Sequence, residues 1–122
     1  MAIKQTTDQA PDQASDQTSD DGGIARLEAE AARVAGVLKL LANENRLLIL
    51  CRLAMAGEMP VGLLSETIGL SQSALSQHLA KLRADGLVDF RRQSQTLYYR
   101  LADDQAARLL MALKDIYCPD LN

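Results

Sequence analysis

The fold is decided by residues 70–101, which read LSQSALSQHLAKLRADGLVDFRRQSQTLYYRL. Early in this stretch Leu75, Leu79 and Leu82 recur at the spacing of one buried stripe along an α-helix. After Gly86 the period falls to two, with apolar and polar residues alternating. Two such runs separated by a polar turn are typical of a β-hairpin. The stretch therefore predicts a helix followed directly by a hairpin.

The segments around this stretch predict four further helices. Apolar residues at three- and four-residue steps predict a first helix over 24–41, and Asn43 is suited to cap a second one that ends before Gly57. A short third helix, Val61 to Ile68, stops at Gly69. After the hairpin, Asp103 or Asp104 caps a last helix that ends at Cys118 and Pro119.

The third and fourth helices fit a helix-turn-helix, because residues 69–71 join them as a short turn and Ser71 suits an N-cap. The fourth helix would then be the recognition helix in the major groove of DNA, and its Gln77 amide can pair with adenine through two hydrogen bonds. The arginines of the hairpin can reach flanking phosphates or the minor groove. The predicted DNA contacts are Ser71, Gln72, Ser73, Ser76, Gln77, Lys81, Arg91, Arg92 and Arg100.

Charge is unevenly distributed along the chain. The formal net charge of the 122 residues is −3, which by itself argues against a nucleic-acid partner. However, residues 1–23 hold one lysine and five aspartates, whereas residues 70–101 hold five basic and two acidic side chains. Local charge decides where a phosphate backbone docks. The basic charge thus lies where DNA contacts are predicted.

Residues 1–23 are predicted to be a disordered acidic and polar tail, because they lack aliphatic residues between Ile3 and the end of the segment. Residues 24–122 are predicted to form one DNA-binding and dimerisation domain. The chain has no apolar run of membrane-spanning length and no secretory signal, so a cytoplasmic protein without a membrane partner is expected.

Residues 38–117 resemble the ArsR/SmtB family of winged-helix repressors. The resemblance rests on Leu41-Ala42-Asn43-Glu44-Asn45-Arg46-Leu47-Leu48, Ser76-Gln77-His78-Leu79, Gly86-Leu87-Val88 and Tyr98-Tyr99-Arg100-Leu101. It implies a mainly α fold with a small β-hairpin wing, a homodimer through the first and last helices, binding to double-stranded operator DNA, and repression relieved by an inducer.

The sequence departs from the metal-sensing patterns of that family. The third helix has no cysteine, the last helix has no histidine, and the single histidine, His78, lies at the edge of a buried stripe and is interpreted as structural. A closed zinc site needs about four nitrogen or sulfur ligands, which two cysteines per chain do not supply without help from a partner subunit. No metal site and no cofactor are expected.

Cys51 in the second helix and Cys118 at the end of the last helix, 67 residues apart, resemble the dithiol of the SqrR/BigR/YgaV branch of the family. That resemblance implies that they sense reactive sulfur species or other oxidants, through a disulfide or polysulfide link that weakens operator binding. Taken alone, Cys51 is also compatible with a small, inert core residue.

Three other interpretations remain open. The same thiols suit a soft ion such as arsenite or Cu(I) in a repressor of the same fold. A thiol peroxidase or disulfide reductase is disfavoured, because the chain has no Cys-x-x-Cys motif and no βαβ pattern. A protein-interaction module without a DNA target is disfavoured by the basic hairpin.

Overall fold

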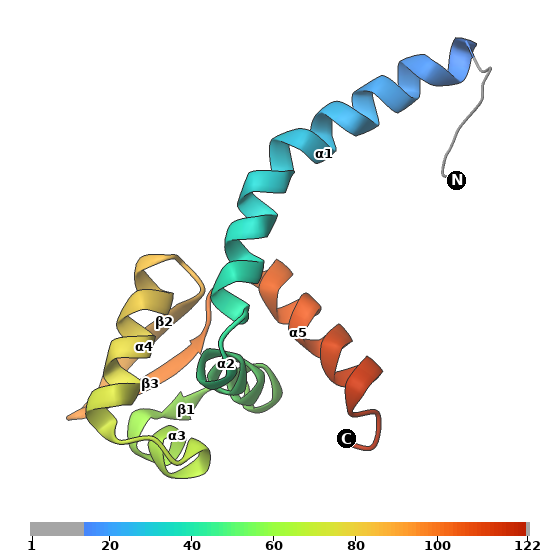
Figure 1. The fold of residues 1–122 in the computed structure, drawn as a ribbon. Helices are drawn as coiled ribbons and strands as arrows, with labels where there is room; N and C mark the ends of the chain where they lie inside the picture. Colours follow the sequence, from blue (N-terminus) through green and yellow to red (C-terminus); the bar gives the residue numbers. More distant parts are fainter. Residues whose placement is uncertain (1–13, 122) are drawn as a thin grey trace. The chain divides into compact units, whose positions relative to one another are not determined.

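The computed structural model describes residues 14–121, and the side chains of residues 22–121. The chain divides into two units, residues 1–36 and residues 37–122. In the second unit, helices and a small sheet follow one another in the order expected from the sequence (Figure 1). Within the residues described, no helix combines the length and the hydropathy needed to cross a bilayer.

The first helix, α1, spans Ala14–Leu41 and therefore begins inside the predicted tail. The predicted start of this helix at residue 24 is therefore too late, while residues 1–13 of the predicted tail lie outside the described part of the chain. Adding a residue to an existing helix costs far less than nucleating a new one. No proline follows Pro11 in this segment, so the helix that the downstream residues form extends upstream through the two glycines at 22 and 23.

Four more helices follow α1 along the chain. They are α2 (Glu44–Ala56), α3 (Val61–Ile68), α4 (Gln72–Ala84) and α5 (Asp104–Tyr117). The Asn43 side chain accepts a hydrogen bond from Arg46 N at 3.1 Å, which confirms it as the cap of α2. Asp103, rather than Asp104, caps α5 by accepting from the backbone N–H groups of two residues in its first turn.

Two hydrogen bonds fix the turn between α3 and α4. Ser65 Oγ donates to the Leu70 carbonyl at 2.5 Å, and Leu70 N donates to the Ser65 carbonyl at 3.2 Å. Gly69 ends α3 in the left-handed region, with φ of 85°, a conformation that favours glycine. Ser71 then starts α4 by accepting from Ala74 N at 3.2 Å. The predicted helix-turn-helix is therefore present, with its turn locked by the two hydrogen bonds between Ser65 and Leu70.

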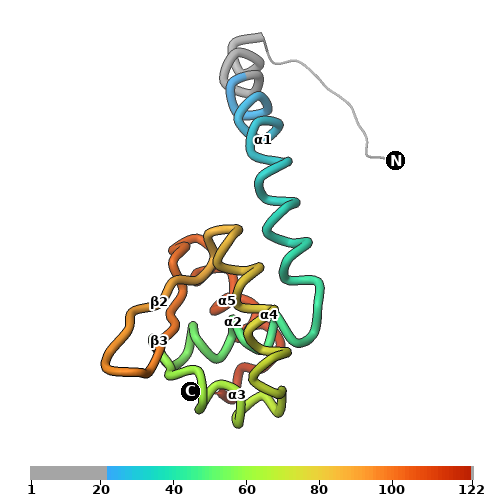
Figure 2. Tube along the Cα trace, turned by 90° about the vertical axis from the view of Figure 1, so that its left-hand side faces the viewer, coloured from blue at the N-terminus to red at the C-terminus, as the bar shows by residue number. Residues whose placement is uncertain are grey.

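The hairpin consists of β2 (Val88–Gln93) and β3 (Thr96–Leu101), which pair antiparallel and project as a loop beside the helices (Figure 2). Its turn is two residues long, and Ser94 takes a φ of 57° there. The sequence did not predict the third strand, β1 (Met59–Pro60), which pairs antiparallel with β3 on the side away from β2. This strand ties the base of the wing to the segment that enters α3.

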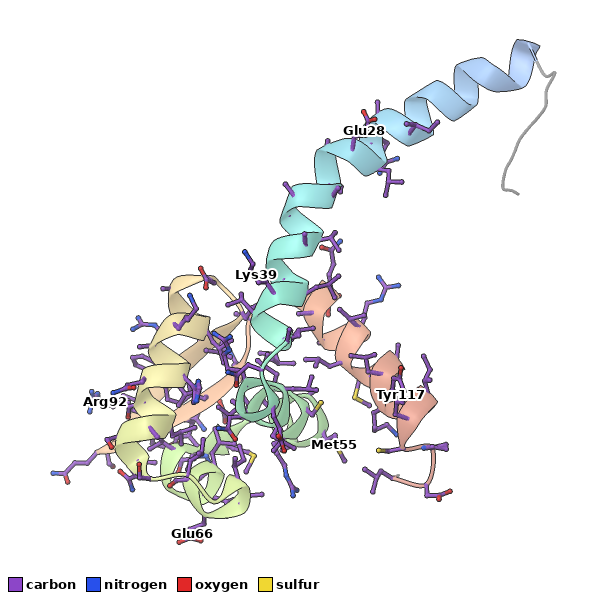
Figure 3. The ribbon with its side chains drawn as sticks, viewed as in Figure 1. Glu28, Lys39, Met55, Glu66, Arg92 and Tyr117 are labelled. Carbon is purple, nitrogen blue, oxygen red and sulfur yellow. The ribbon has the colours of Figure 1, made fainter. Side chains whose placement is uncertain are left out.

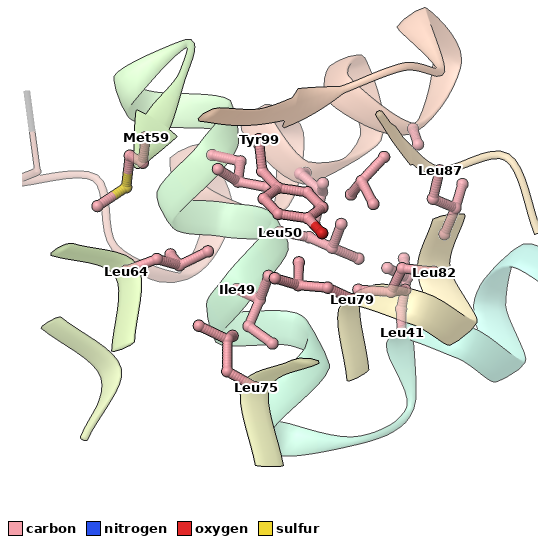
Figure 4. Packing of buried hydrophobic residues seen from close by; sticks show 14 residues of the cluster. Leu41, Ile49, Leu50, Met59, Leu64, Leu75, Leu79, Leu82, Leu87 and Tyr99 are labelled. Carbon is pink, nitrogen blue, oxygen red and sulfur yellow. The ribbon is translucent and has the colours of Figure 1, made fainter. Parts of the chain in front are cut away.

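One apolar core joins all these elements of the second unit (Figure 4). Leu75, Leu79 and Leu82, the stripe expected from the sequence, are at most 1% exposed. They pack with residues from α2, the sheet and α5, and Phe90 lies against Tyr99 with ring centroids 5.3 Å apart. The buried apolar residues are Leu41, Ile49, Leu50, Leu53, Met59, Leu64, Leu75, Leu79, Leu82, Leu87, Val88, Tyr99, Ala106 and Leu110. The core thus fixes both α4 and the hairpin.

Candidate nucleic-acid interface and thiol site

The surface of α4 opposite its leucine stripe is exposed and polar. The side chains predicted to contact DNA from this helix and its cap are all exposed, whereas His78 is half-buried. Lys81 forms a loose ion pair with Asp85, with Nζ and Oδ2 3.8 Å apart, and both side chains face solvent. The exposed residues of this face are Ser71, Gln72, Ser73, Ser76, Gln77 and Lys81. They offer hydroxyl, amide and ammonium groups from one rigid helix.

Arg91, on β2, is exposed, and its guanidinium is bound by other groups of the protein. Its guanidinium donates two hydrogen bonds of 2.9 Å to the Glu58 carboxylate and one of 2.6 Å to Gln93 Oε1, and it stacks 4.5 Å from the centre of the Tyr98 ring. The hydrogen bonds from Arg91 hold the pKa of Glu58 below its usual range. Arg91 therefore braces the wing against the segment that leads into β1.

The other two wing arginines are less constrained. Arg100 lies 4.0 Å from Asp89 across the hairpin, a distance that leaves the guanidinium accessible. Arg92 is exposed and, among the described residues, takes part in no ion pair (Figure 3). Arg83, which sequence reasoning did not select, places its guanidinium 4.4 Å above the centre of the Phe90 ring and so braces α4 on the sheet. Among the three arginines of the hairpin, Arg92 and Arg100 are therefore the two that other groups of the protein hold least.

The two cysteines line a single cavity of about 470 Å³ between α2 and the end of α5. Both are free thiols; Cys51 is half-buried and Cys118 is exposed. Met55 of α2 and Tyr117 of α5, both labelled in Figure 3, also line this space. The apolar lining residues are Leu47, Leu48, Met55, Leu113, Tyr117 and Leu121. The fold thus brings together two thiols that are far apart in the sequence.

Burial raises the pKa of the Cys51 thiol, and the neighbouring Cys118 raises it further. Removing a thiolate from water is unfavourable, and a second negative charge nearby adds to that cost. At neutral pH the Cys51 thiol is therefore mostly protonated.

This pKa predicts the pH dependence of Cys51 alkylation. In a Cys118→Ser protein, the rate with neutral iodoacetamide should rise about tenfold per pH unit below the pKa, since only the thiolate reacts. The midpoint should lie above that of N-acetylcysteine measured in parallel, because desolvation persists without Cys118. In the wild-type chain the Cys51 midpoint should be higher still. A Cys51 midpoint at or below that of N-acetylcysteine would contradict the description of the site.

Lys114, one helical turn before Cys118, is a buried cation that sequence reasoning missed. Its Nζ donates to the Leu121 carbonyl at 2.6 Å and lies 3.0 Å from Asp115 Oδ1. Leu121 N in turn donates to the Cys118 carbonyl at 3.1 Å. These contacts fold residues 118–121 back over the end of α5 and place Leu121 in the cavity wall. The signal in the sequence was a lysine in register with the apolar side of α5, one turn after Leu110.

Within the described residues, no three histidine, cysteine or acidic side chains gather in a way that would hold a metal ion. The reactive groups that line the cavity are the two thiols, and they lie beside the cations Arg52 and Lys114.

Known proteins share both the sequence pattern and the fold of this chain. Residues 43–89 match the family model described as "Bacterial regulatory protein, arsR family". The nodulation protein NolR of Rhizobium meliloti is 53% identical over 91 residues, which cover 75% of this chain and 74% of NolR. The chain belongs to the ArsR family. Its structure is accordingly a winged helix-turn-helix, and it is a DNA-binding regulator of transcription.

Solved structures of ArsR-family relatives agree with the fold. HlyU from Vibrio vulnificus superposes with a TM-score of 0.73 at 45% identity, covering 79% of this chain and 99% of HlyU. The repressor BigR from Xylella fastidiosa gives 0.71 at 41% identity, covering 77% and 95%. A winged helix-turn-helix domain from Mycobacterium bovis, described as homodimeric, gives 0.65 at 36% identity, covering 79% and 88%. The resemblance to the ArsR/SmtB family that the sequence indicated is confirmed for both the family and the fold. BigR, one of these relatives, also gives its name to the branch that the two cysteines resemble.

Proposed function

We propose that this ArsR-family protein is a transcriptional repressor whose operator affinity falls when Cys51 and Cys118 are linked by reactive sulfur species or other oxidants. The observation that supports the proposal is the shared cavity, which is lined by a thiol of α2 and by a thiol at the end of α5. Packing rarely requires cysteine at an exposed helix terminus, where Cys118 lies. The similarity to BigR, which is described as a transcriptional repressor, supports repression rather than activation of transcription.

The chemistry is thiol exchange with a persulfide, RSSH, as the oxidant. One cysteine thiolate attacks the outer sulfur of RSSH, forming a protein persulfide and releasing RSH. The second cysteine then attacks the inner sulfur of that persulfide, forming the disulfide and releasing hydrogen sulfide. If a further RSSH first lengthens the protein persulfide, the second cysteine closes a trisulfide instead. The persulfide is reduced to thiol and sulfide, and the two protein thiols are oxidised.

The proposed partners are double-stranded operator DNA and a second copy of the chain. Apolar residues on α1 and α5 are exposed in the single chain, among them Leu27 at 68%, Ile116 at 69% and Tyr117 at 77%. A homodimer through these two helices would cover such surface. Two recognition helices must reach half-sites about 34–36 Å apart on DNA, so their separation controls affinity.

The link is suited to act on that separation, because α2 contacts both α5 and α3. Joining Cys51 to Cys118 fixes α2 to the end of a proposed dimer helix. A shift of α2 would displace α3, which α2 contacts, and with it the turn that orients α4. In this account, oxidation changes the spacing of the recognition helices and releases DNA.

The experiment that tests the thiol chemistry is intact mass spectrometry with peptide mapping. Reduced protein is treated with a persulfide, with peroxide and with oxidised glutathione. The proposal expects both free thiols to disappear and the Cys51 and Cys118 peptides to be joined, with two hydrogens lost for a disulfide and a further sulfur atom gained where persulfide closes a trisulfide. Retention of both thiols under every oxidant would overturn the proposal, and arsenite and Cu(I) would then be tested as ligands.

The wing yields a separate prediction about DNA binding. Removing one phosphate contact lowers the slope of log K against log salt by about 0.9. Arg92→Gln should produce such a decrease, because Arg92 is exposed and in no ion pair among the described residues. Arg91→Gln should leave the slope nearly unchanged, because Glu58 holds the Arg91 guanidinium. Fluorescence anisotropy over a salt series measures both slopes, and the reverse order would contradict the assignment of the two arginines.

A further inference from the structure

We propose that the cavity beside the thiols selects persulfides with a small apolar organic substituent as the preferred sulfur donors. This inference rests on the proposed function, since it names the class of donor that reacts at the same two thiols. It follows from the size of the cavity, from the polarity of its walls and from the charges at its edge.

The cavity is larger than a polysulfide link requires. It measures about 470 Å³, within the roughly 300–1,000 Å³ typical of small-molecule sites. A water-sized atom occupies about 30 Å³, so one or two added sulfur atoms would leave most of this space open. The remaining volume matches an organic group of several carbon atoms attached to the reacting sulfur.

The walls favour an apolar group over a polar one. The lining comes from leucine, methionine and tyrosine side chains on α2, α5 and residue 121. A donor rich in carboxylates and amides would lose hydrogen bonds to water there without replacing them. An alkyl or aryl substituent would instead remove its own apolar surface, and that of exposed Leu48 and Met55, from water.

The charges suit the thiolate that a persulfide donor releases when its outer sulfur is transferred. Two cations, Arg52 and Lys114, line the cavity, and no carboxylate does so among the described residues. Lys114 is held in place by the Leu121 carbonyl and Asp115, one turn before Cys118. A donor RSSH can thus bring its sulfur atoms towards the cations, which stabilise the departing thiolate RS⁻, and its substituent R towards the apolar wall. After sulfur transfer to a cysteine, R leaves as the thiol RSH.

The test compares n-butyl persulfide with glutathione persulfide, each generated in solution. The rate at which each donor links the two cysteines of the full chain is divided by its rate with N-acetylcysteine, to remove intrinsic reactivity. The normalised rate should be roughly tenfold higher for the butyl donor, as expected for the burial of two methylene groups.

Matched variants assign the preference to the cavity. The double variant Leu48→Gln/Met55→Gln adds polar groups to the lining at two exposed positions and should bring the normalised ratio close to one. Leu63→Gln makes the same change at an exposed leucine of α3 outside the cavity and should leave the ratio unchanged. Circular dichroism verifies that each variant is folded.

The outcomes separate this inference from the proposed function. Equal normalised rates for the two donors, or an unchanged ratio in the double variant, would overturn the donor preference while the thiol switch itself stands. Failure of both donors to link the cysteines would overturn the donor preference, and failure of peroxide and oxidised glutathione as well would overturn both proposals. A butyl preference lost only in the cavity variant would support the selection of apolar donors.

Discussion

Cys51→Ser is expected to give a repressor that binds operator with wild-type affinity but no longer releases it under persulfide. The serine is nearly isosteric and occupies a half-buried position, so the reduced fold should tolerate it. Without the Cys51 sulfur no link to Cys118 can form between α2 and the end of α5. Wild-type protein should lose roughly 100-fold in operator affinity, near the upper end of typical coupling between two sites. The variant should change by less than about twofold on the same scale.

Fluorescence anisotropy with labelled operator, before and after persulfide, measures this difference. Cys118→Ser is the matched variant, and it should behave in the same way because the link requires both sulfur atoms. These are the only two cysteines of the chain, so no other thiol of the same chain can substitute. Operator release by either variant to the extent seen with wild type would show that the inducer acts elsewhere.

Leu79→Ala is expected to lower the free energy of unfolding by about 2–5 kcal/mol, the usual range for a buried leucine. Leu79 is 1% exposed at the centre of the stripe by which α4 packs on the core. Its removal leaves a cavity under the recognition helix. Small domains have only about 5–15 kcal/mol of stability in total, so the variant should unfold at markedly lower urea concentration. Equilibrium urea unfolding followed by circular dichroism gives the value.

Leu63→Ala is the matched control for this loss. It makes the same chemical change on α3, where Leu63 is 49% exposed. Its cost should be less than about 1 kcal/mol, since surface substitutions away from the core change stability little. Equal losses for the two variants would mean that α4 does not pack on the core through Leu79.

The helices of the second unit were predictable because their signals are local. The stripe of Leu75, Leu79 and Leu82, the caps Asn43 and Ser71, and the stop at Gly69 each act within a few residues. The start of α1 was not predictable in this way. Its first residues have a polar composition typical of disorder, and they are helical because a helix that forms downstream extends into them.

Long-range contacts explain what sequence reasoning missed at the DNA-binding surface. Glu58 and Arg91 are 33 residues apart, and nothing in either neighbourhood indicates that they pair. Strand β1 has only two residues, too few for an alternating pattern. The role of Arg91 as a brace for the wing therefore became visible only in three dimensions, whereas the exposed face of α4 followed from helical periodicity.

At the thiol site, too, one part could be predicted from the sequence and another part required the fold. Sequence reasoning selected Cys51 and Cys118 through a resemblance, since a separation of 67 residues has no geometric meaning by itself. The fold adds the common cavity, its apolar walls and the buried Lys114. A lysine on the apolar side of an amphipathic helix was the one local sign that this end of α5 is more than a packing surface.

The central claim, that the Cys51–Cys118 link controls operator affinity, is tested most directly on one sample in three states. The operator dissociation constant is measured for the reduced wild-type chain, for the same protein after persulfide, and again after dithiothreitol. Mass spectrometry of each state records the link. The account predicts tight binding, then weak binding with both thiols linked, then full recovery when the link is reduced. Unchanged affinity in protein shown to be fully linked would contradict it.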